Sequence, residues 1–244
     1  MNEHQKKRMK EGMEEIGFSL KDHQLHQFRD YLELLQEWNQ KMNLTAIKDA
    51  DEILTHHFLD SATCSLYPSY GECHHILDLG TGAGFPGIPL KILFPEQSFV
   101  LMDSLNKRLV FLEKVKETLG LTSLELVHAR AEEGARQKPY RENFDAVVSR
   151  AVASLPVLLE YTIPFLKVDG WFFCQKGPQW KEEIEEAKKA MQVFSVRLED
   201  SLEVKVPFTD LNHQLLVFRK TNATQKTYPR KAGTPSKKPI LNSL

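Results

Sequence analysis

From residue 74 onward, short apolar runs alternate with amphipathic segments, and this alternation restricts the possible folds more than any other feature of the sequence. The segments between the runs, such as KRLVFLEKVKETLG and LPVLLEYTIPFLK, repeat apolar residues at helical spacing. The third connection, residues 130–140, is shorter and less clearly helical. Strands that alternate with helices in this way predict a parallel sheet with helices on both faces. The runs predicted to form its strands are HHILDLG, SFVLMDS, LELVHA, FDAVVSRA and GWFFCQK.

The last part of the chain departs from this alternation. A charged helix is predicted over KEEIEEAKKAMQVF, and two strands follow it, over about residues 196–206 and 213–220. The connection around PFTDLN is so short that these two strands must pair antiparallel. The parallel sheet is therefore expected to end in a hairpin.

The segment from residue 5 to about residue 66 is predicted to be mainly helical. The stretch from Ser19 to Asp22 resembles a helix start. The segment EWNQKMNLTAI interrupts the helical period and is predicted to be a loop, and a second amphipathic run covers about residues 50–66. Apolar residues at three- and four-residue spacing give the first long helix a single apolar face: Leu25, Phe28, Leu32, Leu35 and Trp38.

A glycine-rich loop follows the first predicted strand, in the sequence ILDLGTGAGFPG. Gly80, Gly82 and Gly84 permit positive φ and a close approach of the backbone to a ligand. Such a loop between a strand and a helix lies at the edge where open α/β sheets bind ligands. Asp103 closes the second strand, 19 residues after Gly84. Its carboxylate can accept hydrogen bonds from both ribose hydroxyls of a nucleoside cofactor, and the alternative is a cap for the next helix.

Two cofactor classes compete for this loop. The spacing Gly82-x-Gly84-x-x-Gly87 matches the dinucleotide fingerprint. Pro86 and Pro89, however, lack the N–H groups that a pyrophosphate would need at the following helix. Asp78, inside the end of the strand, and the terminal hairpin also favour S-adenosylmethionine, which has no phosphate. An NAD-dependent oxidoreductase therefore stands as the alternative enzyme.

Two further positions at strand ends are candidate contacts. Ala131 and Glu132 follow the third strand, beside the expected adenine, although Glu132 can equally be an exposed loop acid. Strand four ends in Ser149-Arg150-Ala151. The planar guanidinium of Arg150 suits a carboxylate or a base edge, and the alternative is a surface arginine on a loop.

Charge is distributed unevenly along the chain. Residues 211–244 hold seven basic residues and no acidic one, so the first 210 residues carry 25 basic and 33 acidic residues. An acidic body with a basic tail indicates that the tail contacts a polyanion. A solvated terminus is the alternative interpretation.

Other features exclude several classes of protein. No stretch of about 18 apolar residues is present, and the first residues do not form a secretory signal. Cys64, Cys73 and Cys174 show no CxxC spacing, so neither a disulfide framework nor a zinc site is expected, and a cytoplasmic location fits. Adjacent histidines, as in His56-His57, point apart on a regular element, so no metal site is predicted.

The sequence resembles a known family over nearly its whole length: the small-subunit ribosomal RNA guanine-N7 methyltransferases, also called glucose-inhibited division protein B. Many methyltransferases share the glycine segment, whereas NLT, HFLDS, SRA and PRKAGTP are much more specific. The matching segments are EWNQKMNLT, HHFLDS, ILDLGTGAGFPGIPLKI, DSLNKR, FDAVVSRAVA and YPRKAGTPSKKPI.

The resemblance implies an α/β fold of the class I S-adenosylmethionine-dependent methyltransferases, with a Rossmann-like sheet of seven strands in the order 3-2-1-4-5-7-6. Residues 1–70 would form a helical extension, 71–220 the methyltransferase domain and 221–244 a basic, Pro/Gly-rich tail. The implied reaction is methylation of N7 of guanosine 527, in the 530 loop of 16S ribosomal RNA. The implied cofactor contacts are Gly80, Phe85, Ala131, Glu132 and Arg150.

Guanine N7 carries a lone pair and no proton, so its methylation needs no general base. The enzyme then supplies mainly alignment and electrostatics, and Arg150 is the residue expected to orient the reactants. No DPPY-like tetrapeptide and no Pro-Cys follows strand four, as amine or cytosine C5 methylation would require. A non-catalytic RNA-binding module is disfavoured by the intact glycine loop and Asp103.

The expected partner is 16S ribosomal RNA or an assembly intermediate of the small ribosomal subunit, bound by a monomer without a metal ion. Basic side chains bind phosphate, and Tyr228 can stack on an unstacked base. Lys107 and Arg108 begin the helix after Asp103, where basic charge opposes the helix dipole, which favours a functional role. The predicted RNA contacts are Lys107, Arg108, Arg230, Lys231, Lys237 and Lys238.

Overall fold

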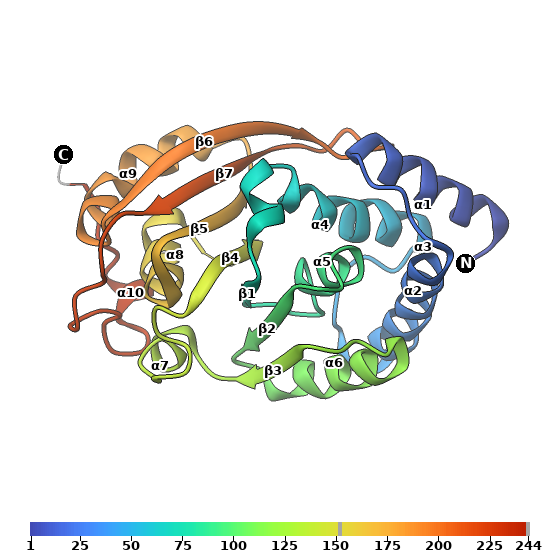
Figure 1. Cartoon of the computed structure of the whole chain (residues 1–244), viewed down its shortest axis with the longest axis horizontal. Helices are drawn as coiled ribbons and strands as arrows, with labels where there is room; N and C mark the ends of the chain where they lie inside the picture. Colours follow the sequence, from blue (N-terminus) through green and yellow to red (C-terminus); the bar gives the residue numbers. More distant parts are fainter. Residues whose placement is uncertain (151–152, 243–244) are drawn as a thin grey trace.

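The computed structural model describes residues 1–150 and 153–242, and within them one sheet of seven strands runs through the molecule (Figure 1). The strand order is β3-β2-β1-β4-β5-β7-β6. β3 to β5 pair in parallel through β2, β1 and β4, whereas β7 pairs antiparallel with both β5 and β6. The predicted sheet and its terminal hairpin are therefore confirmed. The strands are β1 His75–Leu79, β2 Ser98–Asp103, β3 Leu124–His128, β4 Phe144–Arg150, β5 Leu166–Lys176, β6 Val196–Lys205 and β7 Asn212–Lys220.

Helices cover both faces of this sheet because successive strand residues point to opposite sides. Ile76 and Val148 face one apolar cluster, and Leu77 and Val147 face the other. The first cluster includes residues of α1 (Glu3–Ile16), α2 (Asp22–Met42), α5 (Gly87–Leu93) and α6 (Asn106–Leu119). The second includes residues of α8 (Leu155–Thr162) and α9 (Trp180–Val193), next to α7 (Ala131–Gly134). α10 (Thr234–Lys237) contacts α8.

The N-terminal region is helical as predicted, but its helix boundary differs from the prediction. α2 begins at Asp22, and Ser19 lies outside it. The side chain of Gln24 accepts a hydrogen bond from the backbone N–H of Lys21. The side-chain hydrogen bond at the start of this helix therefore comes from Gln24 and not from Ser19. The second amphipathic run is divided into α3 (Ala50–Ile53), a π-helical turn (Leu54–Leu59), α4 (Asp60–Ala62) and short 3₁₀ turns.

Within residues 1–150 and 153–242, no helix is both long and apolar enough to cross a membrane. In the same part of the chain, no group of three His, Cys, Asp or Glu side chains could hold a metal ion. Cys64, Cys73 and Cys174 are buried and form no disulfide there.

The helical extension and the sheet share one core. The cluster that contains Met9 and Phe28 of the extension also contains Ile76 and Leu101 of the sheet. Phe58, in the π-helical turn, is fully buried and packs against Phe28, at a ring-centroid distance of 5.3 Å. Because residues of the extension and of the sheet belong to one apolar cluster, we expect residues 1–70 to unfold together with the sheet.

Replacing Phe58 with Ala tests this. Phe58→Ala should lower the free energy of unfolding by about 3–5 kcal/mol, the cost of removing a buried aromatic ring. Denaturant titration followed by circular dichroism should still give one cooperative transition. Val110→Ala, at a residue 52% exposed on α6, is the control and should change little. Two separate transitions, with only the earlier one shifted, would instead identify the extension as an independent unit.

Candidate active site

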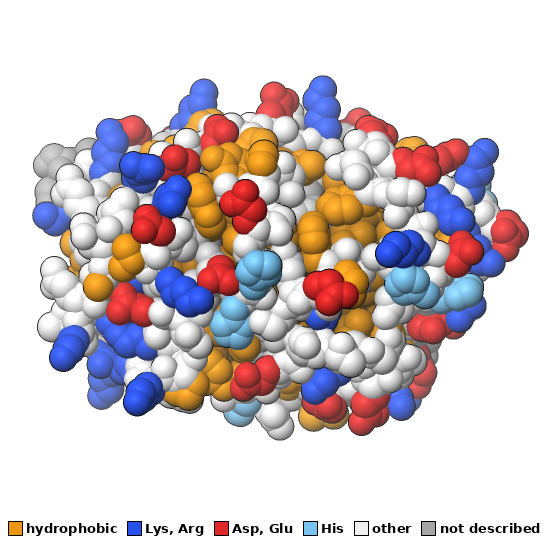
Figure 2. Space-filling view, viewed as in Figure 1, with side chains coloured by type: hydrophobic (Ala, Val, Ile, Leu, Met, Phe, Trp, Pro, Cys, Tyr) orange, Lys and Arg blue, Asp and Glu red, His pale blue; other side chains and the backbone are white. Residues whose placement is uncertain are grey.

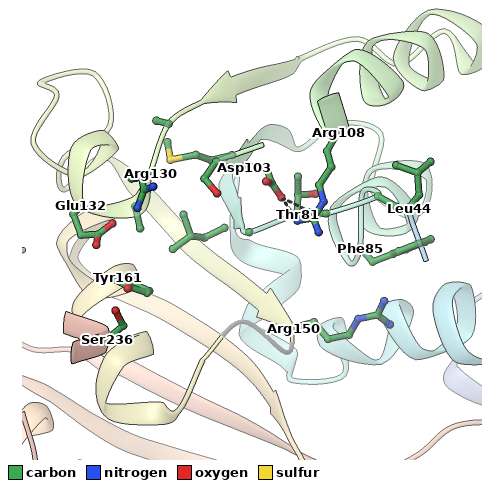
Figure 3. Close-up of a pocket in the computed structure, with 18 of the residues that line it drawn as sticks. Leu44, Thr81, Phe85, Asp103, Arg108, Arg130, Glu132, Arg150, Tyr161 and Ser236 are labelled. Carbon is green, nitrogen blue, oxygen red and sulfur yellow. Dashed lines mark hydrogen bonds and ion pairs between the residues drawn. The ribbon is translucent and has the colours of Figure 1, made fainter. Parts of the chain in front are cut away.

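A cavity of about 510 Å³ lies at the carboxyl ends of the parallel strands β1 to β4. Ligands bind at this edge in open α/β sheets, and roughly 300–1,000 Å³ is usual for cofactor sites. Figure 3 shows that its wall also includes Leu44 from the helical extension and Ser236 from the C-terminal end of the chain. Three distant parts of the sequence therefore meet around one pocket.

The glycine loop forms the floor of this pocket. Gly80 and Gly82 line it and have φ values of 73° and 61°, which side-chain-bearing residues rarely adopt. Gly84 is not among the lining residues and meets a different constraint. A Cβ at Gly84 would lie 2.7 Å from Tyr31 Oη and 2.6 Å from Ile88 Cγ1. The structure thus assigns Gly84 to packing rather than to the pocket wall.

Asp78 also lies behind the wall and shapes the loop from there. Its Oδ2 accepts hydrogen bonds from Thr81 Oγ1, at 2.6 Å, and from the backbone N–H of Gly87, at 2.8 Å. The side chain is fully buried, and burial raises the pKa of Asp78 to about 7. Asp78 is not among the residues that line the pocket, and its side chain holds the loop and the start of α5.

The start of α5 offers little to a pyrophosphate. The N–H of Gly87 is bonded to Asp78, and the N–H of Ile88 donates to the carbonyl of Gly84 at 2.8 Å. Pro89 has no N–H. The first turn of α5 therefore lacks the free donors that dinucleotide-binding helices present.

Asp103 lines the pocket at the end of β2 and is almost fully buried. Its Oδ2 accepts from the backbone N–H of Gly82 (2.9 Å) and from Arg108 Nη1 (3.1 Å). Its Oδ1 accepts from the backbone N–H of Leu105 (2.9 Å). A carboxylate has about four lone-pair positions, so one remains for a ligand. Asp103 thus braces the turn before α6, whose N-cap residue is Leu105, and its carboxylate also faces the pocket.

Arg108, predicted to contact RNA, also lines the pocket and pairs with Asp103. Its neighbour Lys107 is exposed at the first turn of α6. The structure therefore separates these two adjacent basic residues, and only Lys107 is left fully available at the surface.

The side chain of Arg150 reaches from the end of β4 to the helical extension. Its Nη1 donates to Asp60 Oδ2 (2.6 Å) and to the carbonyl of His56 (3.1 Å). Burial alone would raise the pKa of Asp60, but His213 and Arg150 hold it below its ordinary value. Asp60 therefore forms a buried ion pair with Arg150. The residue after Arg150, Ala151, lies outside the described residues.

His57 and Phe85 stack beside Arg150. Their ring centroids are 4.4 Å apart, and the Arg150 guanidinium lies 5.2 Å from the Phe85 ring. Burial, together with the neighbouring Arg150, lowers the pKa of His57 to about 4, so the ring is neutral at pH 7. Arg150 Nη2 donates to His57 Nδ1 (3.2 Å), which leaves the His57 Nε2–H to donate to Thr45 Oγ1 (2.7 Å).

Glu132 lies at the other end of the pocket, with Ala131, Arg130 and Tyr161 (Figure 3). It is only 5% exposed, so the alternative of a solvated loop acid is wrong. Its Oε1 accepts a hydrogen bond from the backbone N–H of Gly233 at 2.8 Å. The C-terminal end of the chain thus contacts a predicted cofactor residue directly.

Two residues of the predicted RNA surface, Arg230 and Tyr228, have partners within the protein. Arg230 donates to both carboxylate oxygens of Glu160, with contacts of 2.6–3.0 Å, and Glu160 is 1% exposed. The ring of Tyr228 packs edge-on against Phe194 at 5.0 Å. Arg230 is therefore a structural anchor. Lys231, Lys237 and Lys238 remain exposed.

Several pocket residues were not predicted as such. Except for Arg130, which precedes Ala131, they lie outside the strand-loop motifs, and only the fold brings them to the site. The signal that could have found them is the specific NLT, HFLDS and PRKAGTP segments, which contain or adjoin several of them. The additional lining residues include Leu44, Thr45, His57, Arg130, Tyr161, Gly233 and Ser236.

The sheet order, the glycine loop after β1 and the acid at the end of β2 define the fold of the class I S-adenosylmethionine-dependent methyltransferases. A putative O-methyltransferase from Klebsiella pneumoniae aligns with a TM-score of 0.54 and 12% identity, over 79% of this chain and 90% of that one. A chain from the complex between the Haloferax volcanii Trm112 methyltransferase activator and the putative methyltransferase aligns with a TM-score of 0.53 and 14% identity. This alignment covers 77% of this chain and 98% of that one. At these identities the likeness concerns the fold alone.

Sequence comparison identifies the family. Residues 24–211 match the family described as rRNA small subunit methyltransferase G, or GidB. The relative named ribosomal RNA small subunit methyltransferase G from Alkaliphilus metalliredigens is 50% identical over 95% of this chain and 97% of its own length. The protein of the same name from Acetivibrio thermocellus is 49% identical over 94% of each chain. The chain belongs to the rRNA small subunit methyltransferase G family, as the resemblance indicated.

Replacing Asp103 tests the pocket. Asp103→Ala should weaken binding of S-adenosylmethionine by about 1.5–3 kcal/mol, the range for a hydrogen bond to a charged group. Titration calorimetry measures this directly. Asp169→Ala, which removes a 72% exposed carboxylate near the start of β5, is the control and should leave the affinity unchanged. An unchanged affinity in Asp103→Ala would rule out the assignment of Asp103 to the ribose.

Proposed function

We propose that this protein transfers the methyl group of S-adenosylmethionine to N7 of a guanine in 16S ribosomal RNA, guanosine 527 of the 530 loop. Membership of the rRNA small subunit methyltransferase G family supports methylation of small-subunit rRNA. The particular atom and nucleotide come from the resemblance in sequence. The observation that carries the choice of cofactor is the start of α5, where the N–H groups are already bonded or absent.

The residues present fit S-adenosylmethionine. Asp103 retains an acceptor for a ribose hydroxyl, and Gly80 and Gly82 present backbone without side chains. A Cβ at Gly82 would meet no atom closer than 4.0 Å, so this part of the loop borders open space. Ala131 and Glu132 would border the base. When bound, S-adenosylmethionine supplies an activated methyl group on a sulfonium.

The titratable groups of the pocket are suited to orientation rather than to proton abstraction. Asp103, Glu132 and His57 each have hydrogen-bond partners within the protein. Guanine N7 has a free lone pair and needs no base. Arg150 has five N–H groups, of which three donate to described residues. The remaining two can donate to a cofactor carboxylate or to guanine O6.

Exposed lysines near the pocket provide a surface for RNA phosphates. Lys231, Lys237 and Lys238 belong to the C-terminal segment, residues 221–242, which reaches the pocket at Gly233. Lys107 lies in the first turn of α6, four residues after Asp103. Figure 2 shows several Lys and Arg side chains at its lower left, the part of the molecule where Figure 1 shows α7 and the loop of the C-terminal segment that precedes α10. Such a surface suits the phosphate contacts that dominate affinity for nucleic acids.

Mapping the methyl group tests the proposal directly. Small-subunit rRNA from cells without this protein should accept one labelled methyl group from S-adenosylmethionine at N7 of the predicted guanosine. Chain cleavage specific for 7-methylguanosine identifies the position. RNA from cells that contain the protein is the control and should accept none there. A label on an exocyclic amine, or at another nucleotide, would overturn the assignment.

The pH dependence of the chemical step tests the mechanism. Because N7 carries no proton, the single-turnover rate should show no steep rise between about pH 6 and 9, where a catalytic base would titrate. Arg150→Lys keeps the charge but loses the planar fork, so it should lower the rate without creating a pH dependence. A log-linear increase with unit slope would mean that an amine or a hydroxyl is the acceptor.

The exposed lysines of the C-terminal segment should contribute to RNA affinity. Replacing Lys231, Lys237 and Lys238 with Ala should weaken RNA binding and make the slope of log K against log salt shallower by about 2–3, since fewer counterions are released. Filter binding across a range of salt concentrations measures this. The matched control replaces three exposed lysines of α9, Lys181, Lys188 and Lys189. An equal loss of RNA affinity in both variants would mean that only the net charge of the protein matters, and would contradict a specific role for the C-terminal segment.

A further inference from the structure

The C-terminal segment, residues 221–242, is bound firmly to the body of the protein after β7 ends. Arg141 donates to the carbonyl oxygens of Thr224 (3.0 Å) and Tyr228 (2.9 Å). Arg136 donates to the carbonyl of Pro229. Glu142 Oε1 accepts from the backbone N–H of Thr224 at 2.7 Å. The basic tail expected from the sequence is therefore a folded part of the molecule in its described portion.

Arg230 provides the strongest of these anchors. Its side chain bonds both oxygens of Glu160, and its backbone N–H also donates to Glu160 Oε1 at 2.7 Å. Glu160 is almost completely buried on α8, where an unpaired carboxylate would be costly. This ion pair fixes the chain three residues before it reaches the pocket.

The segment then forms part of the pocket wall. Gly233 and Ser236 line the cavity. Figure 3 shows Ser236 beside Tyr161, at the same end of the pocket as Glu132. Gly233 adopts φ 78°, a left-handed conformation, and its N–H points to Glu132 Oε1. Pro235, two residues after Gly233, is buried. Without this segment, Glu132 would lose this hydrogen bond, and that end of the pocket would open to water.

We propose that residues 228–238 are an integral part of the cofactor site: they position Glu132 through the backbone of Gly233 and close the end of the pocket that Glu132 borders. The affinity for the methyl donor then depends on a segment that lies about 100 residues from Glu132 in sequence. This inference rests on the proposed use of S-adenosylmethionine, and it requires no assumption about the RNA target.

Hydrogen exchange of the full-length protein tests the proposal without any substitution. The probe is S-adenosylhomocysteine at saturation, in the absence of RNA. It should slow exchange of the amides in residues 228–238 as well as in the glycine loop, residues 80–85. The turn at residues 207–211, between β6 and β7, is the control for a general stabilisation and should change little. Protection of the glycine loop without protection of residues 228–238 would overturn the inference.

A pair of charge-matched variants gives a second measurement. Arg230→Met removes the anchor on Glu160 and should weaken binding of S-adenosylhomocysteine at least about five-fold, the lower end of typical coupling between sites. Lys226→Met removes an exposed charge from the same segment and should bind as the wild type does. Equal affinity in a folded Arg230→Met variant would contradict the proposal. If Arg230→Met fails to fold, the exchange experiment on the wild type still decides the question.

The two proposals fail in different ways. If the wild-type protein does not bind S-adenosylhomocysteine at all, the proposed function is wrong. If it binds and the glycine loop is protected, but residues 228–238 are not protected and Arg230→Met binds as the wild type does, only the proposed role of the C-terminal segment is wrong.

Discussion

A single buried carboxyl determines what the pocket can accept. Asp78 lies inside the sheet at the end of β1, and one of its oxygens holds both Thr81 and the backbone N–H of Gly87. These bonds fix the glycine loop against the strand and start α5 with its first donor already bonded. Because Pro89 removes another donor, the helix cannot receive a pyrophosphate in the usual way. The same interaction that shapes the loop thus favours a cofactor without phosphate.

The sheet provides only the middle of the site, and segments outside it close the two ends. At one end, Arg150 connects β4 to Asp60 of the helical extension and to His57 beside Phe85. At the other end, Gly233 holds Glu132. Neither segment belongs to the alternating strand-helix pattern, yet each shares an apolar cluster with the sheet. The pocket of this protein therefore depends on two segments that lie outside the alternating strand-helix pattern.

The chemistry of the pocket is consistent with alignment. His57 is neutral, and its two ring nitrogens are engaged by Arg150 and Thr45. Asp103 braces the turn at the end of β2 and keeps about one acceptor position. Transfer of a sulfonium methyl group to a lone pair requires orientation and a suitable electrostatic environment rather than proton transfer. Side chains that are held in place by hydrogen bonds to one another can supply this orientation and this electrostatic environment without rearranging.

The sequence by itself determined the sheet, its hairpin, the glycine loop and Asp103, because these depend on local periodicity and on residues close together in the chain. It did not determine that Gly84 packs against Tyr31 or that Arg230 is bound to Glu160. These outcomes depend on contacts between segments 50 to 70 residues apart. Local patterns show which residues are charged or conformationally flexible. They do not show which buried residue each of them contacts in the folded protein. Only the tertiary structure decided that, because a buried acid must find its partner wherever the packing of the chain brings one within hydrogen-bonding distance.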